Sequence, residues 1–191
     1  MFNLSKKTKL ATQSNYFTNY SQLLSDSTIS RILIADEESE VRDALSVAVR
    51  RWAQEEQRNI EIILVENGEQ AVDYVETIDE NNSLFLAILD LRMPQMNGLE
   101  SARIISDRRP NMPIIITVSH DEIDEKLIKD ADDFADYNSH TSFMIRTNSP
   151  QVFKLALESE IKKIEFIEEN IIQENSTLLG NLKGKLTAIL N

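Results

Sequence analysis

Charged side chains stand directly after three apolar runs of the sequence, and their types suit a metal or phosphoryl-transfer site. They are Asp36 and Glu37 after residues 31–35, Asp90 after residues 84–89, and Arg146 after residues 143–145. Short apolar runs that end on polar residues predict buried parallel strands. Because ligands of open α/β sheets bind at the carboxyl ends of the strands, we expect these side chains to lie together there.

The residue types at these positions predict the chemistry. Two or three carboxylates in one shallow cleft provide the oxygen ligands that Mg²⁺ prefers, so Asp36, Glu37 and Asp90 are predicted to bind Mg²⁺, with the backbone carbonyl of Arg92 as a further ligand. The metal would neutralise charge on a phosphoryl group that Asp90 attacks as a nucleophile. The guanidinium of Arg146 would pair with the phosphoryl oxygens. Alternatively, the acidic residues after the first strand only stabilise a helix N-terminus.

The elements that must position these residues alternate along the chain. Strands are predicted at residues 31–35, 60–65, 84–90, 114–118 and 143–145, and helices at 38–52, 69–77, 99–107 and 121–130. Residues 131–142 are predicted to be a long polar link. Ser149 and Pro150 predict the start of a last helix, as N-cap and first helical residue. Five β-α repeats predict an α/β fold with a doubly wound, five-stranded parallel sheet.

Composition limits the class of protein. The 191 residues have a net charge of −12 and no cysteine, so disulfides and cysteine metal sites are excluded. We expect no nucleic-acid binding, because no segment forms a dense basic patch, and no membrane insertion, because no apolar stretch is long enough. A cytoplasmic protein is expected. We predict a mobile polar extension at residues 1–29, a main domain at 30–163 and a helical C-terminal tail at 164–191.

Four motifs in order resemble the receiver domain of bacterial two-component response regulators. They are RILIADEE at 31–38, ENGEQAV at 66–72, LAILDLRMPQMNGLE at 86–100 and PIIITVS at 113–119. The resemblance covers roughly residues 30–161 and implies the flavodoxin-like (βα)5 fold. It implies that Asp90 is the phosphoacceptor, that Asp36 and Glu37 carry Mg²⁺, and that Phe143 is the aromatic switch residue. It also implies a histidine kinase or phosphotransfer protein as the phosphoryl donor.

The sequence departs from the family at two functional positions. The usual Lys-Pro after the fifth strand is Arg146-Thr147, and a planar guanidinium is not equivalent to a compact ammonium. Counting from Pro113 puts the apolar Val118 at the position of the switch hydroxyl. Ser119 is the favoured replacement and Thr117 the alternative. Phe134 is a rival for the aromatic position, but only Phe143 is followed by a cation three residues later.

Two functions from different classes are compatible with these residues. The favoured one is a response regulator that accepts a phosphoryl group on Asp90 and signals by protein contacts without a DNA-binding domain. Such a protein would not be an enzyme beyond its own phosphorylation and autodephosphorylation. The alternative is a pseudo-receiver that acts as a phosphorylation-independent scaffold. Apolar residues in the tail favour a helical pairing surface, for a homodimer or for an output partner that the sequence does not identify.

Overall fold

A computed structural model describes residues 29–78, 84–119, 124–146, 149, 151–152 and 154–163. The side chain of residue 85 is outside this description. The predictions for the tail at 164–191, and for the N-terminal extension except its last residue, lie outside the described residues. No helix in the described part of the chain combines the length and hydropathy that crossing a bilayer demands.

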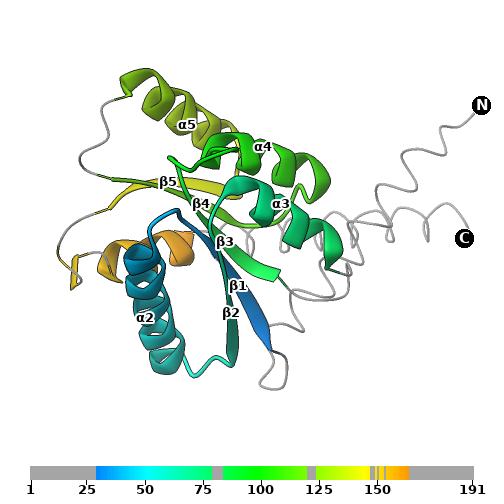
Figure 1. Cartoon of the computed structure of the whole chain (residues 1–191). Helices are drawn as coiled ribbons and strands as arrows, with labels where there is room; N and C mark the ends of the chain where they lie inside the picture. Colours follow the sequence, from blue (N-terminus) through cyan, green and yellow to red (C-terminus); the bar gives the residue numbers. More distant parts are fainter. Residues whose placement is uncertain are drawn as a thin grey trace, which may run out of the picture.

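The described chain forms the predicted parallel sheet, with strand order β2-β1-β3-β4-β5 (Figure 1). The strands are β1 (Ser30–Ala35), β2 (Ile60–Val65), β3 (Leu84–Asp90), β4 (Ile114–Val118) and β5 (Thr141–Ile145). The strand order reverses direction between β1 and β3, because β2 lies outside β1 whereas β4 and β5 follow β3. In doubly wound folds, ligands bind beside such a switch point.

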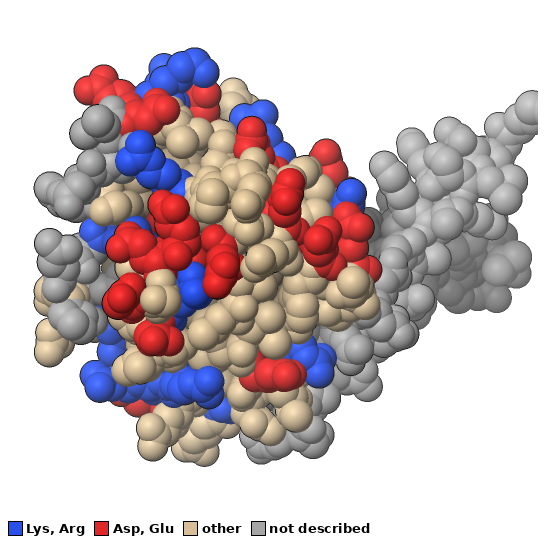
Figure 2. Space-filling view, in the orientation of Figure 1, with Lys and Arg blue, Asp and Glu red and all other residues tan. Residues whose placement is uncertain are grey.

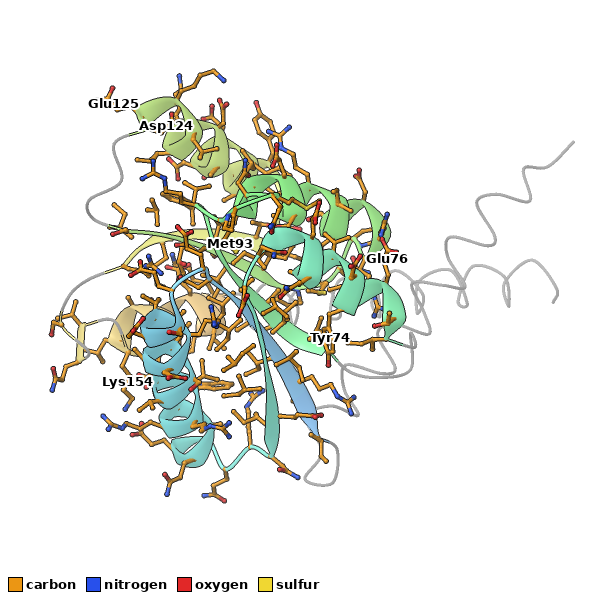
Figure 3. The ribbon with its side chains drawn as sticks, viewed as in Figure 1. Tyr74, Glu76, Met93, Asp124, Glu125 and Lys154 are labelled. Atoms are coloured by element: carbon orange, nitrogen blue, oxygen red, sulfur yellow. The ribbon has the colours of Figure 1, made fainter. Side chains whose placement is uncertain are left out.

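Helices cover both faces of the sheet (Figure 1). They are α2 (Ser39–Glu55), α3 (Gly68–Thr77), α4 (Gly98–Arg108) and α5 (Glu125–Tyr137). Helical residues also occur at 151–152 and 154–163. Helices α3, α4 and α5 lie on one face, whereas α2 and the helical residues after position 150 lie on the other. Figure 3 shows Lys154 beside α2, and the Lys154 ammonium lies 2.7 Å from the Glu55 carboxylate at the end of that helix.

Strand alternation separates two buried cores. Leu33, Leu89 and Ile116 belong to the cluster under α3, α4 and α5, whereas their strand neighbours Ile34 and Ile88 belong to the cluster under α2. Successive side chains of a strand point to opposite faces, which produces this division. Leu157 and Ile161, from the helical residues after position 150, are almost fully buried in the α2 cluster. These two residues therefore complete one face of the domain.

The segment before β5 differs from the prediction. The expected helix at 121–130 is confirmed for residues 125–130, whereas the polar link at 131–142 is wrong, because α5 continues to Tyr137 and β5 already begins at Thr141. One narrow apolar stripe, formed by Leu127, Ile128, Ala131 and Phe134, packs on the α3/α4/α5 core. Acidic residues cover the rest of the helix and make the sequence resemble a polar loop. A single stripe is nevertheless sufficient for a surface helix.

Side chains and close packing fix the helix starts near the sheet edge. The Asn97 side chain accepts a hydrogen bond from the Glu100 N–H, and Glu100 reciprocates, which forms a capping box at the start of α4. A Cβ added to Gly98 would collide with the carbonyl oxygen of Asp90. The start of α4 is therefore packed directly on the main chain at the end of β3. This contact fixes the start of α4 relative to Asp90, the last residue of β3.

Candidate functional site

Three predicted site residues meet at the carboxyl edge of the sheet. Asp90 ends β3, Asp36 follows β1 directly, and Arg146 follows β5 directly. The residues two positions earlier, Ile34, Ile88 and Met144, all belong to the α2 core, so alternation directs Asp36, Asp90 and Arg146 toward that same face. The backbone N–H of Arg146 donates to the Val118 carbonyl at 2.8 Å, which fixes its position at the end of β4.

The two carboxylates are almost completely removed from water. The side chains of Asp36 and Asp90 are 1% and 6% exposed, and that of Arg146 is 13% exposed. Arg146 Nη1 donates to Asp36 Oδ2, and Arg146 Nη2 forms an ion pair with Asp90 Oδ1 at 3.2 Å. The Arg146 guanidinium therefore bridges the Asp36 and Asp90 carboxylates, with one Nη atom on each. This bridge is not evident from sequence, which predicts Arg146 only as a partner of the phosphoryl group.

Backbone amides hold the remaining carboxylate oxygens. The Glu38 N–H donates to Asp36 Oδ1, and the Arg92 N–H donates to Asp90 Oδ2, both at 2.9 Å. Each carboxylate thus bonds the amide two residues further along the chain, which orients it in a local turn. Asp90 Oδ1 is buried and makes no hydrogen bond. It is the oxygen that a phosphorus atom or a metal ion would meet.

Burial dominates the electrostatics of the pair. Desolvation raises the pKa of Asp90 to about 7, and the neighbouring Asp36 and Glu37 charges add to this rise. The Arg146 guanidinium and the Arg92 N–H oppose it. The pKa of Asp36 is also raised by burial, against the Glu38 N–H and Arg146. The guanidinium therefore favours the ionised form of both carboxylates, and burial outweighs it.

The predicted metal ligands are only partly assembled. Within the described residues, no group of three or more His, Cys, Asp or Glu side chains is arranged to hold a metal ion. Glu37 is exposed, whereas Asp36 and Asp90 are buried and both contact Arg146. The chemistry of this pair nevertheless fits a hard divalent cation, because Asp90 Oδ1 is a buried oxygen without a hydrogen bond. Glu37 and the Arg92 carbonyl remain predicted ligands.

Arg42 is a site residue that the sequence analysis missed. Its Nη1 donates to the carbonyl oxygens of Asp36 at 2.7 Å and Glu37 at 3.1 Å, and its Nη2 lies 3.5 Å from the Glu66 carboxylate. Arg42 therefore holds the loop between β1 and α2. A cation one helical turn after an acidic pair is a signal that could have revealed it. Figure 2 shows Asp and Glu gathered around Lys and Arg on the face near the start of α2.

The predicted switch residues lie on different faces of the sheet. Thr117 pairs with Asp90 in the β3–β4 register, and its hydroxyl is fully buried without a hydrogen bond. Val118 and Phe143 pack on the α3/α4/α5 core instead. Ser119 is half-buried just beyond β4, where continued alternation would return it to the Asp90 face. A hydroxyl at Ser119 and the ring of Phe143 are thus not same-face neighbours.

The rival aromatic residue has a packing role. Phe134 lies on α5, where the Arg103 guanidinium stacks over its ring at 5.5 Å from the centroid. This contact joins α4 to α5. Phe143 lies on β5, opposite Ile116 of β4. Phe143 therefore lies on the strand that Arg146 directly follows.

A parallel sheet with this strand order and an acidic pair at its carboxyl edge define a receiver-like protein. The family model of the response regulator receiver domain matches residues 32–135, and the chain belongs to this family. The uncharacterized transcriptional regulatory protein YrkP of Bacillus subtilis is 26% identical over 159 residues. That match covers 82% of this chain but only 58% of YrkP, so the chain spans less than two thirds of that relative.

Solved structures share the fold. A receiver domain protein from Clostridium thermocellum has a TM-score of 0.55 at 17% identity, covering 72% of this chain and 98% of that one. A chain of the CheX-CheY-BeF3-Mg²⁺ complex from Borrelia burgdorferi has a TM-score of 0.52 at 20% identity, covering 68% and 87%. At these identities the similarity shows the fold. The predicted flavodoxin-like receiver architecture is therefore confirmed.

Proposed function

We propose that this receiver accepts a phosphoryl group on Asp90 from a histidine kinase or phosphotransfer protein in the cytoplasm. The observation that supports this function best is the buried Oδ1 of Asp90, which makes no hydrogen bond and faces a cationic side chain. A buried carboxylate with an oxygen that lacks a hydrogen bond can act as a nucleophile once the neighbouring cation moves. Its position at the carboxyl end of β3 places it at the edge where ligands of such sheets bind.

The transfer requires a small set of groups from this chain. One oxygen of the Asp90 carboxylate attacks the phosphorus of a phosphohistidine or acyl phosphate, the bond from phosphorus to the donor breaks, and the donor leaves with that electron pair. The product is an aspartyl phosphate on Asp90. Arg146 would move from the carboxylates to the phosphoryl oxygens, and Ser119 would donate its hydroxyl to one of them. Thr117 is the alternative donor.

A divalent cation, Mg²⁺ by its hard-oxygen preference, belongs to the same proposal. Asp36 and Asp90 would hold it, with Glu37 and the backbone carbonyl of Arg92 completing the protein ligands. When bound, the ion would supply positive charge that offsets the negative charge of the incoming phosphoryl group. Arg42 would keep the acidic loop in position through its two carbonyl contacts.

Output through protein contacts is the second part of the proposal. Large apolar side chains are exposed around β5 and the helical residues after position 150, namely Tyr137, Ile145, Val152 and Leu155. Exposed apolar residues are typical of interaction surfaces. We propose that the β5 edge of the domain contacts an output protein, and that the tail at 164–191 pairs with that partner or with a second copy. The change would pass through the loops near Ser119 and Phe143.

One observation favours a second candidate function. The guanidinium of Arg146 already bridges Asp36 and Asp90, so its single positive charge offsets part of their negative charge. A receiver in this state could act as a constitutive scaffold that keeps the fold without the phosphoryl switch. The intact Asp36 and Asp90 favour the phosphorylated receiver.

Phosphorylation can be tested directly with acetyl phosphate and Mg²⁺, read by intact mass. We expect the mass of one phosphoryl group on the wild-type chain, and none on Asp90→Asn or when a chelator removes the metal. Asp43→Asn is the matched control, because Asp43 is an exposed aspartate on α2. An Asp90→Asn protein that still gains the adduct would contradict the assignment of the acceptor. A wild-type chain that never gains it would support the scaffold.

A further inference from the structure

The guanidinium of Arg146 occupies the centre of the acidic pair. It contacts Asp36 Oδ2 through Nη1 and Asp90 Oδ1 through Nη2, and these are the two carboxylate oxygens that backbone amides do not hold. All three side chains are largely buried from solvent. A divalent cation bound by Asp36 and Asp90 would need the same two oxygens. The guanidinium and the metal ion therefore cannot contact these two oxygens at the same time.

We propose that Arg146 is a resident counter-cation that competes with the divalent metal ion for Asp36 and Asp90. This inference rests on the metal-binding part of the proposed function. Two positive charges in a pocket of low dielectric repel each other strongly. A metal ion can consequently bind both carboxylates only when the Arg146 side chain has rotated away. The receiver thus resists metal loading until the guanidinium is released.

The residue type matters for this competition. A guanidinium presents its donors in a rigid planar fork, and here the two Nη atoms of one fork engage two different carboxylates. A lysine ammonium is a compact point charge that a flexible stem can move aside. Arginine at this position therefore opposes the metal more than lysine would.

Release of Arg146 requires a change in its side chain alone. Its backbone N–H is anchored to the Val118 carbonyl at 2.8 Å, so the end of β5 need not move. The released guanidinium would remain at the same edge of the sheet, within the region where the phosphoryl group arrives. One side chain would then stabilise the carboxylates before phosphoryl transfer and the phosphoryl oxygens after it.

Titration calorimetry with MgCl₂ alone tests the competition. Arg146→Gln removes the positive charge, and we expect it to bind Mg²⁺ about tenfold more tightly than the wild type, since close buried charge pairs couple by at least that factor. Arg146→Lys should lie between the two. Arg31→Gln is the matched control, because Arg31 pairs with Glu61 on a neighbouring strand and has no contact with either site carboxylate. A pH of about 8.5 keeps the carboxylates ionised.

The opposite results would overturn the proposal. Equal or weaker Mg²⁺ affinity in Arg146→Gln, or no Mg²⁺ binding by any variant, would show that the guanidinium does not limit metal binding. If Arg146→Gln fails to fold by circular dichroism, wild-type NMR with labelled arginine side chains decides, with Arg146→Lys identifying the signal. We expect the Arg146 guanidinium signal to move on Mg²⁺ saturation. An unmoved signal refutes the competition.

The same variants separate this inference from the proposed function. If Asp90 is not phosphorylated, no variant gains the phosphoryl mass, but the Mg²⁺ affinities still differ between wild type and Arg146→Gln. If the competition is wrong, the affinities are equal whether or not the adduct forms.

Discussion

Without divalent cations, replacing Asp90 with asparagine should raise the free energy of unfolding at a pH of about 8. The gain should be much smaller at a pH of about 4. The reason is the cost of burying an ionised carboxylate. Burial is the largest cause that raises the pKa of Asp90 from 3.8 to about 7. The charges that face it are Asp36 and Glu37, which raise the pKa further, and Arg146, which lowers it together with the Arg92 N–H.

The sign and size follow from proton linkage. Because the folded pKa lies above the unfolded value, the folded state binds more protons between pH 3.8 and about 7, and the free energy of unfolding falls as the pH rises through that window. A rise of roughly three units corresponds to about 4 kcal/mol at most. The attraction of Arg146 is already contained in that pKa, but the asparagine amide leaves donors without a partner in the same buried position, so we expect a net gain of about 2 kcal/mol.

Urea unfolding with a chelator present measures this difference. Trp52 is the single tryptophan of the chain and is 2% exposed, so its fluorescence reports loss of the α2 core. Asp43→Asn, which alters an exposed aspartate, should leave the free energy of unfolding within about 0.5 kcal/mol at both pH values. If Asp90→Asn is less stable than the wild type at the higher pH, or if its effect is the same at both, the burial argument is refuted.

Two further predictions concern packing around the site. Gly98→Ala should lower the free energy of unfolding by about 2 kcal/mol, because the new methyl group would press on the Asp90 carbonyl oxygen; an unchanged urea midpoint would contradict this. Leu157→Ala should cost about 3 kcal/mol because Leu157 is fully buried against the α2 core. Leu155→Ala on the same helix is its control, since Leu155 is 64% exposed, and equal losses in both variants would show that the helix does not pack as described.

Much of the fold could be predicted from the sequence, for a physical reason. A buried parallel strand needs apolar residues on both faces, so β3 and β4 are apolar runs, and each also ends near a proline, a glycine or a polar residue. The C-terminal half of helix α5 is not evident from sequence because only Leu127, Ile128, Ala131 and Phe134 bury its inner side. Its many acidic residues are compatible with either a loop or a solvated helix face.

The site was predictable in its members and less so in its contacts. Residues at strand ends meet because the topology requires it, which is why Asp36, Asp90 and Arg146 could be grouped from sequence. The Arg146 bridge depends on the rotamer of a buried side chain, and the periodicity of the sequence does not predict rotamers. Likewise, the separation of Ser119 from Phe143 depends on strand parity at a point where the sequence leaves the register open.

The main chain around Asp90 has a consequence for amide hydrogen exchange. The Leu91 N–H donates to the Thr117 carbonyl at 2.7 Å, and the Gly98 N–H donates to the Leu91 carbonyl at 3.0 Å. With Gly98 packed against the Asp90 carbonyl, we expect these amides to exchange slowly with solvent. We therefore expect the backbone at Asp90 to belong to a slowly opening part of the domain. Phosphorylation would therefore leave the backbone at Asp90 in place, and we expect the backbone that responds to lie in the loops beyond β4 and β5.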